Sequence, residues 1–168
     1  AFNELLIDQF AKHLEVVIKP SQIVWSNGSR LEKTSFHIKV ACDHYWPVAE
    51  RPKMKDFFRL VNQQCLATKG FHFYTTVDDL LQLNSILDLS VYSANRCFRS
   101  LGCRKPDSTT LAPISGAVTH SAIVAHMLTV TNREGLTPFV LKSKCKIPVV
   151  NSRIETSALG ELAQKYGA

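Results

Sequence analysis

The sequence predicts an α+β fold, a small mixed sheet with flanking helices, and two kinds of pattern support it. Apolar residues recur at helical spacing over about 2–18 and 52–68. Shorter stretches near 22–25, 34–41 and 71–75 combine apolar runs or alternation with neighbouring turn residues, which is typical of strands. In 168 residues, one compact domain around one core accommodates these elements most economically.

The N-terminal segment 2–18 is expected to form an amphipathic helix that ends before Pro20. Its apolar side chains are Phe2, Leu5, Leu6, Phe10, Leu14 and Val17. A short strand over 22–25 should follow, and the pair Asn27-Gly28 predicts a tight hairpin turn. The next strand, about 34–41, alternates polar with apolar residues, so it should be half buried with one polar face.

A second amphipathic helix is expected over 52–68, closed by Gly70 and followed by a strand over 71–75. The segment 78–83 fits either a helical turn or a loop. An apolar run then ends at Asp88, which we interpret as the end of a strand.

Beyond Asp88 we expect extended structure at 91–92 and 97–101, with a bend at Asn95-Arg96. Proline, glycine and serine residues predict a loop-rich boundary over 106–116. Helical segments should follow at 119–130 and 157–166.

Composition limits the class of protein before any motif is considered. Hydrophobic residues make up 45% of the chain, which is typical of folded globular proteins. No apolar run approaches the roughly 18–20 residues that cross a bilayer, so we expect no membrane partner. The net charge of +6 favours an anionic partner. Five cysteines without C-x-x-C spacing favour a reduced, intracellular protein.

The most informative segment begins at Asp88. Its carboxylate can hold a divalent metal, and it precedes a dense group of fixed cations, namely Arg96, Arg99, Arg104 and Lys105. A metal together with oriented cations is what a site needs to bind and react a triphosphate. Upstream, Lys33, Ser35 and His37 alternate along the predicted strand and should share one face. We expect Ser35, His37 and Asp88 to lie close together in the fold.

These two segments resemble motifs II and III of the archaeo-eukaryotic primase superfamily, in its PrimPol-like and viral primase branch. The resemblance rests on Ser35-x-His37 and on Asp88 followed by Val-Tyr-x-x-Asn-Arg-x-Phe-Arg, with Lys105 six residues further on. It covers about residues 30–105. It implies an RRM-like catalytic core, template-dependent nucleotidyl transfer, and Mg²⁺ or Mn²⁺ as cofactor.

The same resemblance implies nucleoside triphosphates, a single-stranded DNA template and a primer as ligands. A helicase or other replication proteins are further partners that it suggests. The nucleus, the mitochondrion and a viral replication site are all compatible locations within the cell.

The resemblance also assigns roles to individual residues. Asp88 is the expected catalytic metal ligand, and His37 is expected to donate a hydrogen bond to a triphosphate oxygen during catalysis. The expected triphosphate ligands are Lys33, Ser35, His37, Arg99 and Lys105. Arg96 either contacts the nucleotide or braces Asp88 or a neighbouring loop. Tyr92 either stacks on a base or packs inside, and we favour packing.

One motif of the family has no counterpart in this sequence: no Asp-x-Glu, the source of two further metal-binding carboxylates, precedes Ser35. We therefore expect residues 1–168 to be a single domain that is a segment of a larger primase catalytic domain. Its motif-bearing core would span 1–105, and a helical, loop-rich remainder 106–168. A catalytically degenerate module that binds nucleotide or single-stranded nucleic acid is the alternative. An unrelated basic RNA-binding domain is a weaker one.

Overall fold

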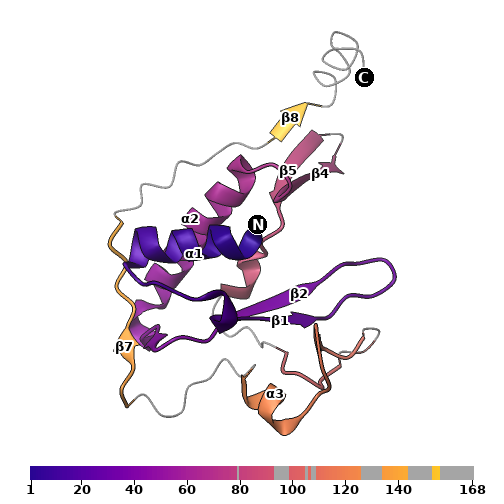
Figure 1. Cartoon of the computed structure of the whole chain (residues 1–168). Coiled ribbons are helices and arrows are strands. Elements are labelled where there is room, and N and C mark those ends of the chain that lie inside the picture. Colours follow the sequence, from indigo (N-terminus) through magenta and orange to yellow (C-terminus); the bar gives the residue numbers. More distant parts are fainter. Residues whose placement is uncertain are drawn as a thin grey trace.

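The fold is taken from a computed structural model, which describes residues 1–78, 80–92, 99–104, 106, 109–125, 134–143 and 153–155. Within these ranges the chain mixes helices with short strands, and this confirms the predicted α+β class (Figure 1). The helices are α1 (Phe2–Leu14), α2 (Arg51–Ala67) and α3 (His120–Ala125). Short 3₁₀ turns are η1 (Pro20–Gln22), η2 (Val48–Glu50) and η3 (Leu89–Tyr92).

The described strands form three small sheets instead of the single sheet expected. They are β1 (Ile23–Asn27), β2 (Phe36–Val40), β3 (His44–Tyr45), β4 (His72–Val77), β5 (Leu80–Ser85), β6 (Ala112–Pro113), β7 (Thr137–Pro138) and β8 (Arg153–Glu155). Two sheets are antiparallel, with the orders β2-β1-β6 and β4-β5-β8, and the third is the parallel pair β3-β7.

The core lies where α1 and α2 meet the β1–β2 hairpin, as Figure 1 shows. Phe57 of α2 is 0% exposed, and its ring meets that of Phe10 edge to face at 5.0 Å between centroids. On the hairpin side, the indole nitrogen of Trp25 donates a hydrogen bond to the Asn3 side-chain oxygen at 3.0 Å. Apolar burial of this kind is the main force that holds the two helices and the hairpin together.

The first helix is shorter than its apolar pattern predicted. It ends at Leu14, because Glu15 adopts a left-handed conformation with φ 56° and its N–H bonds back into the helix. The chain is then extended, and alternate residues Val16 and Ile18 are buried. The apolar run therefore continues past the helix end with a period of two, which explains why the predicted helix was too long.

The predicted tight turn at Asn27-Gly28 is wrong. Strand β1 continues to Asn27, which pairs with Phe36, and the Gly28 N–H donates to the Ser35 carbonyl at 2.8 Å. The hairpin reverses further out, where the backbones of Arg30 and Lys33 bond to each other in both directions. Cross-strand pairing beyond the Asn-Gly pair thus overrides the local turn preference.

Segment 78–83 forms neither of the two predicted structures. Strands β4 and β5 form a hairpin, and Asp78 at its turn has a positive φ of 51°. Strand β5 ends at Ser85, so the predicted strand end at Asp88 is also wrong. Residues 91–92 belong to η3 instead of extended structure.

The first part of the helix predicted at 119–130 is present as α3. Its remainder, the predicted bend at 95–96 and the helical segment at 157–166 lie outside the described residues.

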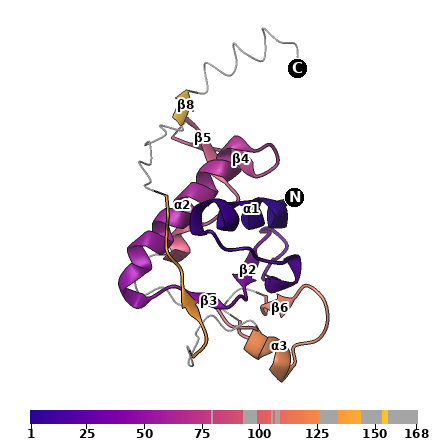
Figure 2. The ribbon, with the colours of Figure 1, turned by 60° about the vertical axis from the view of Figure 1, so that its left-hand side comes forward.

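The segment after β7 is joined to the end of α1 by specific hydrogen bonds. The backbone N–H of Lys142 donates to the His13 carbonyl at 2.9 Å, and the His13 ring nitrogen Nδ1 lies 2.5 Å from the Ser143 hydroxyl. Burial, aided by the nearby charge of Lys12, lowers the pKa of His13. Figure 2 shows this segment running past the end of α1. Among the described residues, no helix has both the length and the apolar character needed to cross a membrane.

Candidate functional site

The β1–β2 hairpin carries polar side chains on the face that is turned away from the core. Strand pairing places His37 directly opposite Ser26, and Lys39 lies two residues further along β2. Paired residues of antiparallel strands share one face, and so do residues two apart on a strand. Ile38, between them, packs against the hydrophobic core. The alternation predicted for this strand is therefore confirmed for His37 and Lys39.

Strand β6 brings the second motif segment onto this hairpin. It pairs with the last two residues of β1, so the chain just before it must lie beside the hairpin. The Gly102 N–H donates to the Leu111 carbonyl at 2.9 Å, which closes the base of the intervening loop. The Thr109 hydroxyl then donates to the Ser29 carbonyl at 2.6 Å and connects that loop to the hairpin. Hydrogen bonds therefore fix residues 99–104 and 109–111 to each other and to the hairpin.

Arg99 is positioned by two contacts within this arrangement. Its Nη1 donates to the Thr109 carbonyl at 2.8 Å. Its guanidinium also lies directly over Gly28, where an added Cβ would come within 2.5 Å of Nη2. Glycine at position 28 therefore allows an approach that any other residue would obstruct. A guanidinium carries five N–H donors, so the bond to Thr109 is compatible with a phosphate contact.

His37 and Arg99 meet at one small cavity, although they are distant in sequence. Its lining residues are Ser26, His37, Ile38, Lys39, Arg99, Leu101 and Leu111. With about 10 Å³ of space, the cavity holds about one water molecule. A phosphate is too large for this volume, so an anion of that size could bind only at the edge of the cavity.

Lys39 was absent from the predicted site, yet it lines this cavity. The predicted strand alternation places Lys39 on the same polar face as His37, although the predicted triphosphate ligands do not include it. Burial lowers the pKa of the Lys39 ammonium. Desolvation of this kind is also how proteins adjust lysines that act in binding sites.

The two other predicted residues of the first motif lie differently. Ser35 immediately precedes β2, and its backbone is used by the hairpin, since its N–H donates to the Ser29 hydroxyl at 2.9 Å. Lys33 lies in the reversal at the end of the hairpin and is exposed. The prediction that Lys33 shares the strand face of His37 is wrong, because β2 starts three residues later. Neither residue lines the cavity.

Asp88 lies at the start of η3, and its Oδ1 accepts a hydrogen bond from the Ser90 N–H at 2.9 Å. A carboxylate has about four lone-pair positions, so this capping bond does not prevent metal binding. Asp88 is exposed and does not line the cavity of His37 and Arg99. The close approach of Asp88 to His37 stays a prediction.

Tyr92 packs inside instead of being presented to a base. Its ring stacks on that of Phe58 in α2, with 4.1 Å between centroids and 12° between planes. Burial raises the pKa of the Tyr92 phenol, and the negative charge of Asp88 contributes in the same direction. Asp88 is therefore electrostatically coupled to a ring that is stacked on α2.

Arg96 and Lys105 lie outside the described residues, together with Asn95 and Phe98. Arg104 is described and is exposed. In the part of the chain that is described, no group of three or more His, Cys, Asp or Glu side chains could hold a metal ion. Among the predicted site residues that the structure describes, Asp88 is the one that carries a carboxylate.

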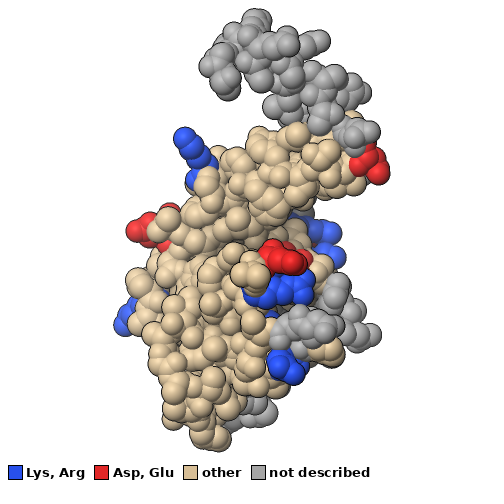
Figure 3. Space-filling model, turned by 90° about the vertical axis from the view of Figure 1, so that its right-hand side faces the viewer, with Lys and Arg blue, Asp and Glu red and all other residues tan. Residues whose placement is uncertain are grey.

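The positive charge is not gathered into one broad surface on the face shown in Figure 3. Small blue areas are separated by uncharged surface, and acidic side chains lie beside some of them. The local convergence of His37, Lys39 and Arg99 is therefore a more specific indication of an anion site than the net charge.

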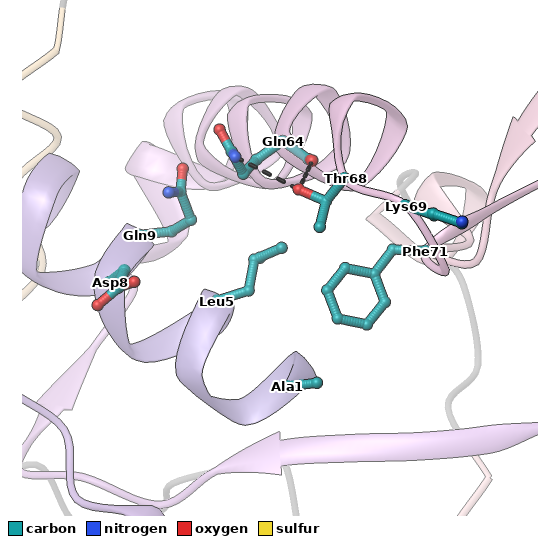
Figure 4. A pocket seen from close by; sticks show the side chains of 8 residues that line it. All are labelled: Ala1, Leu5, Asp8, Gln9, Gln64, Thr68, Lys69 and Phe71. Atoms are coloured by element: carbon teal, nitrogen blue, oxygen red, sulfur yellow. Dashed lines mark hydrogen bonds between the residues drawn. The ribbon is translucent and has the colours of Figure 1, made fainter.

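A second, larger cavity of about 350 Å³ lies between α1 and the end of α2. Figure 4 shows its lining residues, which are Ala1, Leu5, Asp8, Gln9, Gln64, Thr68, Lys69 and Phe71. Its charged residues are one acid and one base, and the ammonium of Lys69 points away from the hollow in Figure 4. It contains no residue of either motif, and its mixed charge does not favour an anion.

Comparison of the chain with protein-family models, curated proteins and solved structures finds no match.

Proposed function

We propose that this chain is the nucleotide-binding part of a DNA primase or primase-polymerase of the archaeo-eukaryotic type. One observation carries the proposal: His37 and Arg99, from the two motif segments, line the same cavity. The sequence predicted this pairing from the resemblance, and nothing in local propensity requires it. In this proposal the described helices and sheets are part of an RRM-like catalytic core.

Phosphate binding would take place at the mouth of the cavity. The Arg99 guanidinium, held by Thr109 and Gly28, would offer paired donors to phosphate oxygens. His37 would donate a further hydrogen bond, more strongly when protonated. Ser35, Lys33 and Lys105 would join them only around a bound triphosphate, since the first two do not line the cavity and Lys105 lies outside the described residues.

Asp88 fits a metal ligand of the kind that Mg²⁺ uses, one or two carboxylates together with substrate phosphates. Bound there, Mg²⁺ or Mn²⁺ would neutralise charge that develops on the phosphates. Catalysis with two metals needs a cluster of carboxylates, and in the described part of the chain no group of three or more His, Cys, Asp or Glu could form one. The reaction would join a primer 3′ oxygen to the α-phosphorus of the nucleotide and break the α–β bond, with pyrophosphate leaving and the hydroxyl proton passing to solvent.

A degenerate, non-catalytic module that grips nucleotide or single-stranded DNA is the second candidate. The observation that favours it is that the described residues contain no group of three or more His, Cys, Asp or Glu side chains that could hold a metal ion. A base-stacking RNA-binding surface has less support. The exposed aromatic residues Phe73 and Tyr74 are neighbours on β4, so they point to opposite faces and form no shared platform.

The first test is to titrate a fluorescently labelled nucleoside triphosphate into the wild-type chain and into His37→Ala. We expect His37→Ala to weaken binding by about 0.5–1.5 kcal/mol, which is typical for one hydrogen bond. His120→Ala is a matched control because His120 is exposed on α3. Equal affinity of His37→Ala and wild type, with equal circular dichroism, would remove the nucleotide site from this hairpin.

A second assay separates the two candidates. Without an Asp-x-Glu, residues 1–168 alone are not expected to extend a primer. In the larger catalytic domain that the sequence predicts, primer extension on a single-stranded DNA template, with Mn²⁺ and labelled deoxynucleotides, should give products that disappear in Asp88→Asn. Triphosphate binding without any extension would favour the binding module.

A further inference from the structure

Lys39 occupies a place that the primase resemblance does not assign. It lies two residues after His37 on the same face of β2, and both side chains line the cavity that Arg99 also reaches. Three basic side chains, from two distant segments, therefore converge on one space. Along β2, His37 and Lys39 are regularly spaced, because residues two apart on a strand are separated by roughly 6.5–7 Å.

The environment of Lys39 is costly for a cation. The residue is half buried, and desolvation lowers the pKa of its ammonium. An oxyanion bound beside the cavity would favour the charged form of this ammonium.

We propose that Lys39 is a third ligand of this site, which contacts the oxygens of a polyphosphate together with His37 and Arg99. The nucleoside part of the ligand rests on the proposed function. The contact of Lys39 itself requires only adjacent phosphate groups. Three basic side chains around one cavity, two of them spaced along a strand, suit a chain of phosphates better than a single phosphate. The ligand class is therefore a di- or triphosphate.

A purely structural role would use the stem of Lys39 and not its charge. Its methylenes can cover apolar neighbours such as Leu101 while the ammonium reaches solvent. Lys39→Met separates the two roles, because methionine keeps an unbranched apolar stem and removes the charge. Lys69→Met is the matched control, since it removes the same charge from the other cavity.

The experiment is calorimetric titration of inorganic tripolyphosphate, and separately of ATP, into the 168-residue wild-type chain, into both variants and into Arg99→Lys. We expect Lys39→Met to bind both ligands about tenfold more weakly, in line with a lost charged hydrogen bond, and Lys69→Met to bind them like the wild type. Circular dichroism and thermal midpoints verify folding. In parallel, ¹³Cε chemical shifts of the lysines should show the pKa of Lys39 rising when tripolyphosphate binds, because an anion favours the charged form.

The outcomes distinguish the two proposals. If Lys39→Met binds like the wild type while Arg99→Lys binds more weakly, Lys39 is not a ligand and the nucleotide site stands. If Lys39→Met weakens tripolyphosphate binding but ATP binds no better than tripolyphosphate, Lys39 is supported and nucleotide recognition is not. Weaker binding by Lys69→Met, an unchanged Lys39 pKa, or no binding of either ligand to the wild type would each overturn the role of Lys39.

Discussion

The two faces of the β1–β2 hairpin are stabilised in different ways. Its core face is covered by apolar side chains of α1 and α2. Its other face is covered by the segment around Arg99, which buries Leu101 and Leu111. In addition, this segment is held by hydrogen bonds from Thr109 and Gly102 and by close approach to Gly28. Burial is non-directional, whereas hydrogen bonds depend steeply on geometry. Changes on the cation-bearing face should therefore alter ligand binding with little effect on the fold, and changes in the core should do the opposite.

The largest expected effect is on the core face. Phe57→Ala removes a fully buried ring that contacts Phe10 and lies 6.2 Å from the Trp46 ring. We expect the free energy of unfolding to fall by about 3–5 kcal/mol, measured by urea denaturation. Phe73→Ala is the control, because that ring is 49% exposed and should matter much less. Equal losses in the two variants would mean that the core lies elsewhere.

The next effect is on the cation-bearing face. Arg99→Lys removes a planar guanidinium that can grip two phosphate oxygens at once, which an ammonium cannot reproduce. We expect triphosphate affinity to fall by about 1.5–3 kcal/mol, measured by titration, with an unchanged circular dichroism spectrum. Arg59→Lys, where the arginine pairs with Asp56 on α2, should bind normally. A loss of stability without a loss of affinity in Arg99→Lys would reverse the comparison between the faces.

Gly28→Ala should have a smaller effect on the same face. The new methyl group would come within 2.5 Å of the Arg99 Nη2 and displace the guanidinium. Gly28 has no positive φ, so the hairpin itself should tolerate alanine. We expect triphosphate affinity to fall by about 1 kcal/mol. A double-mutant cycle is the control: in the Arg99→Lys background, the effect of Gly28→Ala should shrink, and full additivity would contradict the contact.

The smallest effect concerns a titratable group on the core side. Burial lowers the pKa of His13, so the folded state favours its neutral form. Its contribution to stability is complete above the ordinary histidine pKa near 6.5 and decreases as the pH falls through that value. Urea denaturation at pH 7.5 and 5.5 should show lower stability at the acidic pH, and His13→Gln should reduce that difference. An identical difference in His13→Gln would mean that other groups cause it.

Elements with strong periodicity were predictable from the sequence, and elements set by distant pairing were not. The helix at α2 was predicted to within a residue at either end, because its apolar stripe is long and Pro52 marks its start. The hairpin turn was misplaced at Asn27-Gly28, since cross-strand bonds to Ser35 and Phe36 extend the pairing. Segment 78–83 carries no clear period and proved to be half of a hairpin.

The candidate site shows the same division. Strand alternation placed both His37 and Lys39 on one polar face, but the family resemblance named only His37 as a ligand. The meeting of His37 with Arg99 could be expected only through the family resemblance, because it depends on the pairing of β6 with β1. Lys33 was misplaced because alternation was extended beyond the strand, into the reversal of the hairpin.

A crystal structure of this chain with Mn²⁺ and a non-hydrolysable nucleoside triphosphate tests the central claim most directly. The account predicts phosphate groups at the mouth of the cavity, in hydrogen-bond contact with His37 and Arg99, and an anomalous Mn²⁺ peak on the carboxylate of Asp88. Phosphates bound in the cavity between α1 and α2, or a manganese peak remote from Asp88, would contradict it.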